Sequence, residues 1–284
     1  MTAASSLPAL RLFTTCDDRG PRDEVLIRLL HSLRRSSEQG AEVHHYLLLQ
    51  NCADPAASRV RLGLGDEVRL ISDPGQLSLS RARNILMDAF LSEAKDDDVV
   101  AFPDDDAWYP DGFAVWMSQQ FGQNPDLDFL FCRYASSPTP VETAPPARPA
   151  GVMDVLKFAS SNTLFARAAR IRAVGHYDEE LGVGAAHGGG EDTDYGLRLR
   201  KMSRVMAFVD AALVGHRDKF AGLRGRYYQG GLAAIARNVS SDPAVLLQMV
   251  RKVLVGGYLV LKREHSLGDW LGATRAAVVR PLRK

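Results

Sequence analysis

Short apolar runs alternate with amphipathic segments through the first half of the chain. Residues 22–35 and 79–94 carry apolar side chains at helical spacing. The apolar runs have the length and composition of buried strands and lie at residues 9–15, 42–50, 67–72 and 98–103. Strands that alternate with helices predict an α/β fold, in which helices cover a largely parallel sheet.

The pattern changes in the second half. Another apolar run, residues 127–134, leads into the proline-rich stretch 138–149, which predicts a loop, lid or disorder because proline cannot pair inside a sheet. Next come a predicted strand near residues 162–166, a glycine-rich loop from Gly182 to Gly190, a helix, and an apolar run that ends at His216. Beyond it the sequence predicts helices separated by glycines. We expect an α/β domain over residues 1–216 and a helical extension over residues 217–284.

Charge is distributed unevenly although the totals nearly cancel. The 35 Lys and Arg residues against 34 Asp and Glu residues give no indication of a nucleic-acid partner. Residues 217–284, however, carry 13 basic and 4 acidic side chains, a net charge of +9. Such an extension suits peripheral contact with an anionic membrane. A basic solvated helical face or a dimer contact explains it equally well.

The sequence favours a cytoplasmic protein, on the inner face of the membrane if the extension binds lipid. The three cysteines are far apart and lack the spacing of zinc sites or small disulfide frameworks. Residues 1–9 lack the basic start and following apolar run of a signal peptide, so none is expected. Residues 244–261 are long enough to span a bilayer, but Arg251 and Lys252 lie in the middle of this segment, where charge is costly.

Two aspartate triplets flank the predicted strand at residues 98–103. Asp96-Asp97-Asp98 precedes its apolar residues and Asp104-Asp105-Asp106 follows them. Ligands of open α/β sheets bind beyond the carboxyl ends of the strands. The second triplet is therefore the candidate site, and we interpret the first as a solvated turn.

Three adjacent carboxylates repel one another, and a hard cation such as Mg²⁺ or Mn²⁺ best offsets that repulsion. In an extended segment Asp104 and Asp106 project to the same side, so one can bind the metal while the other reaches the ribose of a nucleotide or the metal's other ligands. The alternative is an acidic loop that caps the next helix. The strand that runs into the acids, and Trp108 just after them, favour the site. Trp108 could bind a sugar ring or pack under a loop.

A second acidic motif, Gly188 to Asp194, precedes an amphipathic helix. Consecutive glycines would let the backbone approach a ligand, and a carboxylate there could accept a proton from an attacking hydroxyl. Capping of the helix alone would also explain the acids. Because a helix N-terminus favours negative charge, we expect a lowered pKa for Asp192. His216 could be a third metal ligand or a satisfied histidine at a strand end.

Together these motifs resemble the inverting family 2 glycosyltransferases with a GT-A fold, and more narrowly the bacterial members that assemble surface polysaccharides. LFTTC resembles their first nucleotide-binding strand, LSRARN the helix that helps to hold the nucleotide, and VVAFPDDDAWYPDGF the metal-binding strand and following helix. SSNTLFARAARIRAVGHYDEEL is similar to the floor of the donor and acceptor sites. GGGEDTDYGLRLR is similar to the acidic catalytic helix, and LVGH to the strand that carries a late metal ligand. The likeness covers residues 9–216.

The resemblance implies a mixed, Rossmann-like sheet flanked by helices. It also implies sugar transfer from a nucleotide-diphosphate sugar, expected to be a UDP-sugar, to a hydroxyl of a glycan or lipid-linked acceptor in cell-surface polysaccharide biosynthesis. Asp106, Asp104 and His216 would hold Mn²⁺ or Mg²⁺. Asp192 would be the general base, and Glu191 would hold the acceptor or orient the site. The implied nucleotide-sugar contacts are Thr14, Thr15, Asp17, Arg81, Arg83, Asn84, Asp104, Asp105, Trp108 and Asn162.

Two other functions fit part of the pattern. A sugar nucleotidyltransferase also needs a metal and an α/β sheet, but it should have a glycine-rich, basic phosphate loop after the first strand. The sequence TTCDDRGPRDE has one glycine there. A catalytically silent module that binds a sugar or nucleotide could keep the same fold, because fold does not prove activity.

Overall fold

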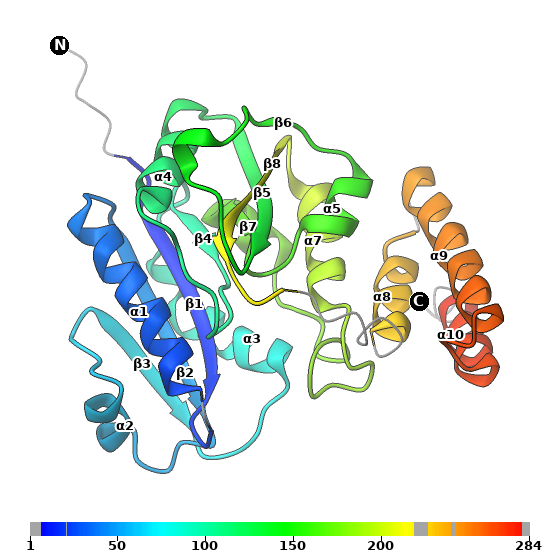
Figure 1. Ribbon diagram of the computed structural model, residues 1–284, viewed down its shortest axis with the longest axis horizontal. Coiled ribbons are helices and arrows are strands. Elements are labelled where there is room, and N and C mark those ends of the chain that lie inside the picture. Colours follow the sequence, from blue (N-terminus) through cyan, green and yellow to red (C-terminus); the bar gives the residue numbers. More distant parts are fainter. Residues whose placement is uncertain (1–6, 21, 219–226, 240–241, 280–284) are drawn as a thin grey trace.

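Eight strands form a single sheet in the part of the chain that the computed structural model describes, residues 7–20, 22–218, 227–239 and 242–279. The order across the sheet is β3-β2-β1-β4-β7-β5-β8-β6. The strands are β1 (Leu10–Asp17), β2 (Val43–Gln50), β3 (Val68–Asp73), β4 (Val99–Ala101), β5 (Leu127–Ala135), β6 (Arg148–Pro149), β7 (Leu164–Arg167) and β8 (Val205–Gly215). Figure 1 shows helices on both faces of this sheet. The predicted α/β class is confirmed.

The helices enclose two hydrophobic cores, one on each face of the sheet. α1 (Asp23–Glu38) and α4 (Phe113–Gln123) pack over one face. α3 (Leu79–Phe90) and α7 (Glu191–Met202) pack over the other. The remaining helical segments are α2 (Pro55–Arg61), η1 (Leu91–Glu93), η2 (Val141–Thr143), α5 (Val152–Phe158), α6 (Ala168–Val174), α8 (Tyr228–Arg237), α9 (Pro243–Leu261) and α10 (Leu267–Val279).

Strand direction differs between the two halves of the sheet. Strands β1 to β4 are parallel to one another, as the alternation of strands and helices predicts. β7 then runs antiparallel to both β4 and β5, so the sheet is mixed. A short apolar strand such as LFAR does not encode its direction, and apolar periodicity could not reveal this reversal.

The proline-rich stretch ends as part of the sheet. Arg148 and Pro149 form β6, which pairs antiparallel with the edge of β8. Proline is tolerated on an edge strand because its missing N–H is not needed for a further neighbour. The rest of residues 138–149 is loop and the short η2, in agreement with the prediction.

The first aspartate triplet is not uniformly solvated. Asp96 and Asp97 are exposed, but Asp98 is buried and accepts a hydrogen bond from the guanidinium group of Arg11 on β1. A buried arginine needs a counter-charge, and Asp98 supplies it from the start of the neighbouring strand. The interpretation as a solvated turn is therefore wrong for Asp98.

The C-terminal helices pack against the α/β part of the chain (Figure 1). α8 contacts α7, α9 and α10, so the predicted helical extension is confirmed as helical. Its boundary at residue 217 stays a prediction. Residues 219–226, 240–241 and 280–284 of the predicted extension lie outside the described residues.

Candidate active site

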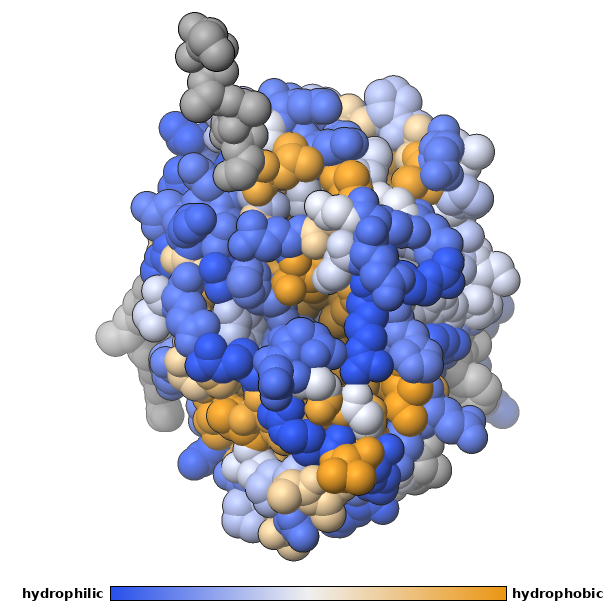
Figure 2. Space-filling view, turned by 90° about the vertical axis from the view of Figure 1, so that its left-hand side faces the viewer, coloured by the Kyte–Doolittle hydropathy of each residue, from blue (hydrophilic) through white to orange (hydrophobic). Residues whose placement is uncertain are grey.

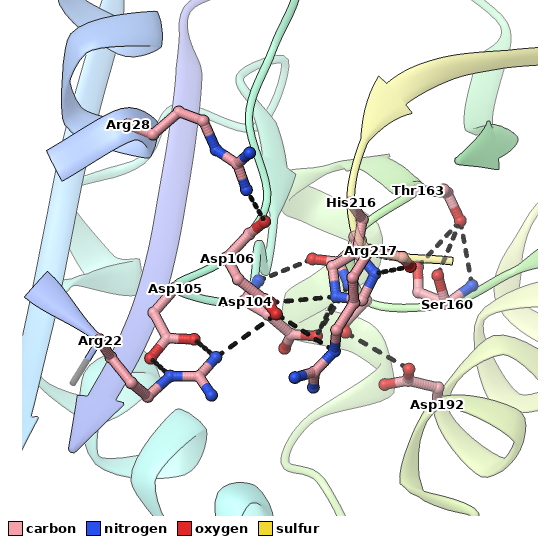
Figure 3. Close-up of polar contacts among 12 residues, drawn as sticks. Arg22, Arg28, Asp104, Asp105, Asp106, Ser160, Thr163, Asp192, His216 and Arg217 are labelled. Atoms are coloured by element: carbon pink, nitrogen blue, oxygen red, sulfur yellow. Dashed lines mark hydrogen bonds and ion pairs between the residues drawn. The ribbon is translucent and has the colours of Figure 1, made fainter. Parts of the chain in front are cut away.

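The ends of two strands bring the acidic triplet and the histidine together. β4 leads into Asp104 to Asp106, and β8 ends directly before His216. Candidate ligand atoms of Asp104, Asp106 and His216 all lie within 4.8 Å of one another. His216 Nε2 lies 3.0 Å from Asp106 Oδ1 and 3.7 Å from Asp104 Oδ2 (Figure 3). The three predicted metal ligands thus share one place.

The hydrogen bonding of His216 suits a metal ligand. Its Nδ1 lies 2.9 Å from the carbonyl oxygen of Arg217, which can only accept, so Nδ1 carries a proton. In a neutral imidazole Nε2 would then carry the lone pair that binds a metal. Nε2 and Asp106 Oδ1 are both buried, and apart from each other, at 3.0 Å, neither has a hydrogen-bond partner among the described residues. A divalent cation would satisfy both atoms, and two carboxylates with one imidazole suit Mn²⁺ or Mg²⁺.

Asp104 is held from two sides. The side-chain oxygen of Asn162 accepts the backbone N–H of Asp104 over 2.7 Å, and the Asn162 amide donates to Asp104 Oδ2 over 2.8 Å. Arg83 Nη2 donates to the other carboxylate oxygen over 3.0 Å. The predicted sugar contact Asn162 is buried, and this double contact makes it a positioning residue for Asp104.

Arg83 links the metal-ligand cluster to the predicted base. Its guanidinium group is 2% exposed and donates from Nη1 to Asp192 Oδ1 over 3.2 Å. The same group pairs with Asp104, so one buried cation lies between the two acidic sites. Arg81, two residues earlier in α3, is exposed and lies outside this network of contacts. The pair predicted together is thus split, because residues two apart face different sides of a helix.

The acids of α7 lie at its N-terminus beside the cluster. Ser161 Oγ donates to Asp192 Oδ2 over 3.3 Å, and the Asp192 side chain is 27% exposed. Burial and the Asp104 carboxylate raise the pKa of Asp192, although Arg83 acts in the opposite direction. Burial and the neighbouring Asp192 raise the pKa of Glu191 to about 7. The expected lowering for Asp192 is therefore wrong, because burial and charge crowding outweigh the helix dipole.

Two of the three glycines before α7, Gly189 and Gly190, approach another helix. Gly190 has a φ of +92°, and a Cβ there would lie 2.3 Å from the backbone oxygen of Gly230 in α8. A Cβ on Gly230 would lie 2.1 Å from the oxygen of Gly189. Only glycines allow this contact. Gly189 and Gly190 therefore pack against α8, whereas a Cβ on Gly188 would meet open space, and an approach of this backbone to a ligand stays a prediction.

Two arginines that the sequence analysis did not select face Asp106. Arg22, at the start of α1, pairs with Asp105 and lies 3.5 Å from Asp106 Oδ2. Arg217 Nε lies 3.2 Å from the same oxygen. Figure 3 shows Asp105 turned toward Arg22, with Arg217 and His216 beside Asp106. Arg22 follows the carboxyl end of β1, and Arg217 follows His216, so strand-end position was the available signal.

The charges around Asp106 favour its ionised form. Burial by itself raises the pKa of Asp106, but His216, Arg217 and Arg22 together bring it below its usual value. Burial raises the pKa of Asp105 despite the pairing with Arg22. Asp105, predicted to contact the nucleotide sugar, forms an ion pair with Arg22 in this structure. Asp106 remains a charged candidate for a metal ligand.

Trp108 joins the two segments that carry the metal-ligand candidates. Its backbone N–H donates to Gly215 over 2.9 Å and its carbonyl accepts from Gly215 over 2.8 Å. The Trp108 ring occupies the space that a side chain at position 215 would need, and Arg28 stacks 3.6 Å from the ring centroid. Of the two interpretations, packing accounts for these contacts.

The predicted nucleobase contacts lie along β1 but differ in accessibility. Thr14 is buried and its hydroxyl is 3.0 Å from His45 Nε2. Thr15 is half-buried, and Arg19 lowers the pKa of Asp17 to about 2. Asn84 is buried and exchanges hydrogen bonds with the backbone of Tyr177, so it fixes a loop. Thr15 and Asp17 are the accessible members of this set.

Comparison of the sequence with protein families and with curated proteins finds no match. Solved structures do match. The chain aligns with S. aureus TarS 1–349 at a TM-score of 0.62 and 13% identity, over 86% of this chain and 71% of that one. The same protein in complex with UDP gives a TM-score of 0.57 at 14% identity, over 88% and 70%. Both are glycosyltransferases with a GT-A fold.

A second kind of protein gives the same result. GalNAc-T7 with UDP, GalNAc and Mn²⁺ aligns at a TM-score of 0.55 and 12% identity, over 81% of this chain and 48% of that one. The chain has the GT-A fold. Identities this low establish the architecture alone, so the chemistry of this GT-A chain must be argued from its own residues.

Proposed function

We propose that this GT-A protein is an inverting, metal-dependent glycosyltransferase of the family 2 type. Its donor is a nucleotide-diphosphate sugar, a UDP-sugar, and its acceptor is a hydroxyl of a glycan or lipid-linked substrate in cell-surface polysaccharide biosynthesis. One observation carries the proposal: Asp104, Asp106 and His216 converge within 4.8 Å, and Arg83 connects this cluster to Asp192. The UDP of the TarS complex and the Mn²⁺ and UDP of the GalNAc-T7 structure support it.

The leaving group determines what the basic residues do. Asp104, Asp106 and His216 would hold a Mn²⁺ or Mg²⁺ ion, which would supply Lewis-acid stabilisation of the diphosphate. Arg22 and Arg217, both next to Asp106, place two further positive charges where the bond between the anomeric carbon and the diphosphate oxygen breaks. Electrostatic complementarity to the departing diphosphate is thus built from protein side chains as well.

Asp192 supports the other half of the reaction. It takes the proton of the acceptor hydroxyl as that oxygen forms its bond to the anomeric carbon and the diphosphate oxygen leaves from the opposite side. Such an in-line displacement inverts the anomeric configuration without a covalent intermediate. Ser161 and Arg83 orient the carboxylate. The raised pKa makes Asp192 a stronger base than an ordinary aspartate.

A donor screen tests this function. Thermal stabilisation and turnover of several nucleotide sugars are measured with Mn²⁺, with Mg²⁺ and with EDTA, for wild type, Asp106→Asn and Asp97→Asn. Asp97 is an exposed member of the first triplet and is the matched control. We expect metal-dependent stabilisation by a UDP-sugar, about 2.7 kcal/mol at a hundredfold excess over Kd. It should persist in Asp97→Asn and disappear in Asp106→Asn.

The other outcomes separate the alternative functions. Stabilisation without turnover in the presence of acceptors indicates a silent binding module. Formation of a nucleotide sugar from a nucleoside triphosphate and a sugar phosphate indicates a nucleotidyltransferase. A metal-independent response that Asp106→Asn leaves unchanged contradicts the proposed site.

A further inference from the structure

The last two helices form a hairpin that is anchored on its inner side. Asp242 caps α9 by accepting the backbone N–H of Ala244 and pairs with Arg200 of α7. Trp270 of α10 donates its indole N–H to the carbonyl of Val253 in α9 over 3.0 Å. Tyr228 of α8 donates to the carbonyl of Lys252 over 3.0 Å. The orientation of α9 is therefore fixed by α7, α8 and α10.

The outer side of this hairpin is strongly apolar. Ten of the sixteen large hydrophobic residues that are exposed in the described chain lie on α9 and α10. On α9 they recur at intervals of three or four, which places them on one stripe. Leu254 is 68% exposed and Leu261 is 83% exposed. We call this surface the α9–α10 apolar face; it comprises Leu246, Leu247, Val250, Leu254, Val255, Tyr258, Leu261, Leu267, Leu271 and Val278.

The opposite flank of the molecule differs. Figure 2 views the side on which α1 and α2 lie in Figure 1, and that side is covered mainly by hydrophilic residues with hydrophobic ones between them. Exposed single apolar residues are ordinary on soluble proteins, but a continuous stripe marks an interaction surface. The apolar face thus needs a covering partner.

Charge decides between the candidate partners. Residues 217–284 carry a net charge of +9, and Arg251, Lys262, Arg263 and Arg275 are exposed on or beside the two helices. A second copy of this chain would bring the same positive charge against the apolar face. An anionic lipid surface provides both an apolar acyl-chain region for these side chains and negatively charged headgroups for the basic residues. We propose that the α9–α10 apolar face docks on an anionic membrane.

The geometry of α9 favours a helix that lies in the membrane surface. By length and composition its 19 residues could cross a bilayer, with 17% of the apolar window buried in the protein. Crossing would remove α9 from Asp242, Tyr228 and Trp270 and carry Arg251 and Lys252 into the hydrocarbon. An in-plane helix keeps these contacts and inserts its outer side chains at the boundary between headgroups and acyl chains.

Docking would place the N-terminus of α7, with Glu191 and Asp192, near the lipid. The backbone of α8 packs against Gly189 and Gly190, directly before Glu191 and Asp192. Only α8 thus separates the hairpin of α9 and α10 from Glu191 and Asp192, the acids proposed to act on the acceptor. A lipid-linked acceptor would reach these acids from the surface on which the protein rests.

Vesicle flotation of the full chain tests the docking without any donor or acceptor, so its result is independent of the proposed activity. Vesicles of phosphatidylcholine alone are compared with vesicles containing about 30% phosphatidylglycerol. The variants are Leu247→Ser/Leu254→Ser on the apolar face and Lys262→Glu/Arg263→Glu at its basic end. Val60→Ser/Val183→Ser changes exposed apolar residues elsewhere and is the control.

We expect wild type and control to float with anionic vesicles. The double serine variant should partition at least about tenfold less, because two exposed leucines lose their apolar burial. The double glutamate variant should lose the preference for anionic lipid. Circular dichroism checks that each variant is folded. Absence of wild-type binding, or equal binding by the folded serine variant, overturns the proposal. A dimer in solution that the serine variant disrupts, without vesicle binding, assigns the face to a second copy instead.

Discussion

The two aspartate triplets flank the same strand, yet they differ in what remains unsatisfied around them. In both, every carboxylate pairs with an arginine. Arg172, Arg167 and Arg11 pair with Asp96, Asp97 and Asp98; Arg83, Arg22 and Arg217 pair with Asp104, Asp105 and Asp106. The number of ion pairs therefore does not distinguish a structural acidic cluster from a candidate site.

The two triplets differ in whether their carboxylates converge with a further metal ligand and in whether their buried polar atoms lack further partners. Asp96 and Asp97 project into solvent, and the arginines that pair with them also donate to backbone carbonyls. At the second triplet two carboxylates and an imidazole converge, and Asp106 Oδ1 and His216 Nε2 are buried with no hydrogen-bond partner among the described residues other than each other. Buried polar atoms without partners are costly, and a functional site is the common reason to retain them.

The largest expected effect is on the second triplet. Asp106→Asn should lower kcat/KM for sugar transfer by about 10³-fold, because the cation that stabilises the leaving diphosphate loses a charged ligand. Titration with Mn²⁺, followed by transfer rate, should show weakened metal affinity. Asp97→Asn should change neither quantity more than about twofold. Equal losses in both variants would remove the distinction between the triplets.

Asp192→Asn tests whether Asp192, the carboxylate that Arg83 connects to the metal-ligand cluster, is the general base. We expect kcat to fall by about 10²- to 10⁴-fold, the usual contribution of a general base, while donor binding changes little. Rapid-mixing assays with saturating donor measure kcat, and calorimetric titration measures donor affinity. Loss of donor affinity with kcat preserved would instead assign Asp192 to donor binding.

Asp98→Asn tests the first triplet, where we expect a loss of stability. Asp98 and Arg11 are both buried, and removal of one partner leaves the other charge uncompensated. The free energy of unfolding should fall by about 3 kcal/mol. Chemical denaturation measures this change, and kcat/KM at 20 °C should stay within about threefold of wild type. A marked loss of activity in the folded variant would contradict the structural role.

Much of the fold was predictable because the spacing of apolar residues and the composition of each segment indicate its secondary structure. Four strands, the two helices between them and the helical C-terminal region follow from apolar spacing alone. The resemblance correctly implied a mixed sheet, but apolar spacing could not show which strand is antiparallel or that β6 forms an edge, since direction and pairing of short strands depend on tertiary contacts.

The candidate site was predictable where it lay in contiguous motifs. Asp104, Asp106, Asp192 and His216 stand at strand or helix ends and come together as expected. Arg22 and Arg217 follow strand ends but were missed, because strand-end position alone does not show which distant carboxylate an arginine faces. Asn84 and Asn162 were selected, but their amides are used in positioning contacts that only the folded chain shows.

The smallest expected effect concerns proton binding beside the second triplet. Burial and the charges of Asp192 and Asp104 raise the pKa of Glu191 to about 7 in the folded protein, from an ordinary value of 4.5. Between these pH values the folded state holds a proton that the unfolded state has lost, so stability falls as pH rises. In metal-free protein Glu191→Gln should match wild type near pH 4 and exceed it near pH 8, by on the order of 2 kcal/mol.

Thermal unfolding in EDTA from pH 4 to 9 measures this difference. Glu38→Gln, at the exposed end of α1, is the control for removal of one charge. A stability difference that grows with pH for Glu191→Gln alone would show that burial and the charges of Asp192 and Asp104 raise the proton affinity of Glu191. Parallel pH profiles for wild type and both variants would contradict the raised pKa of Glu191 and the interaction of its carboxylate with Asp192 and Asp104.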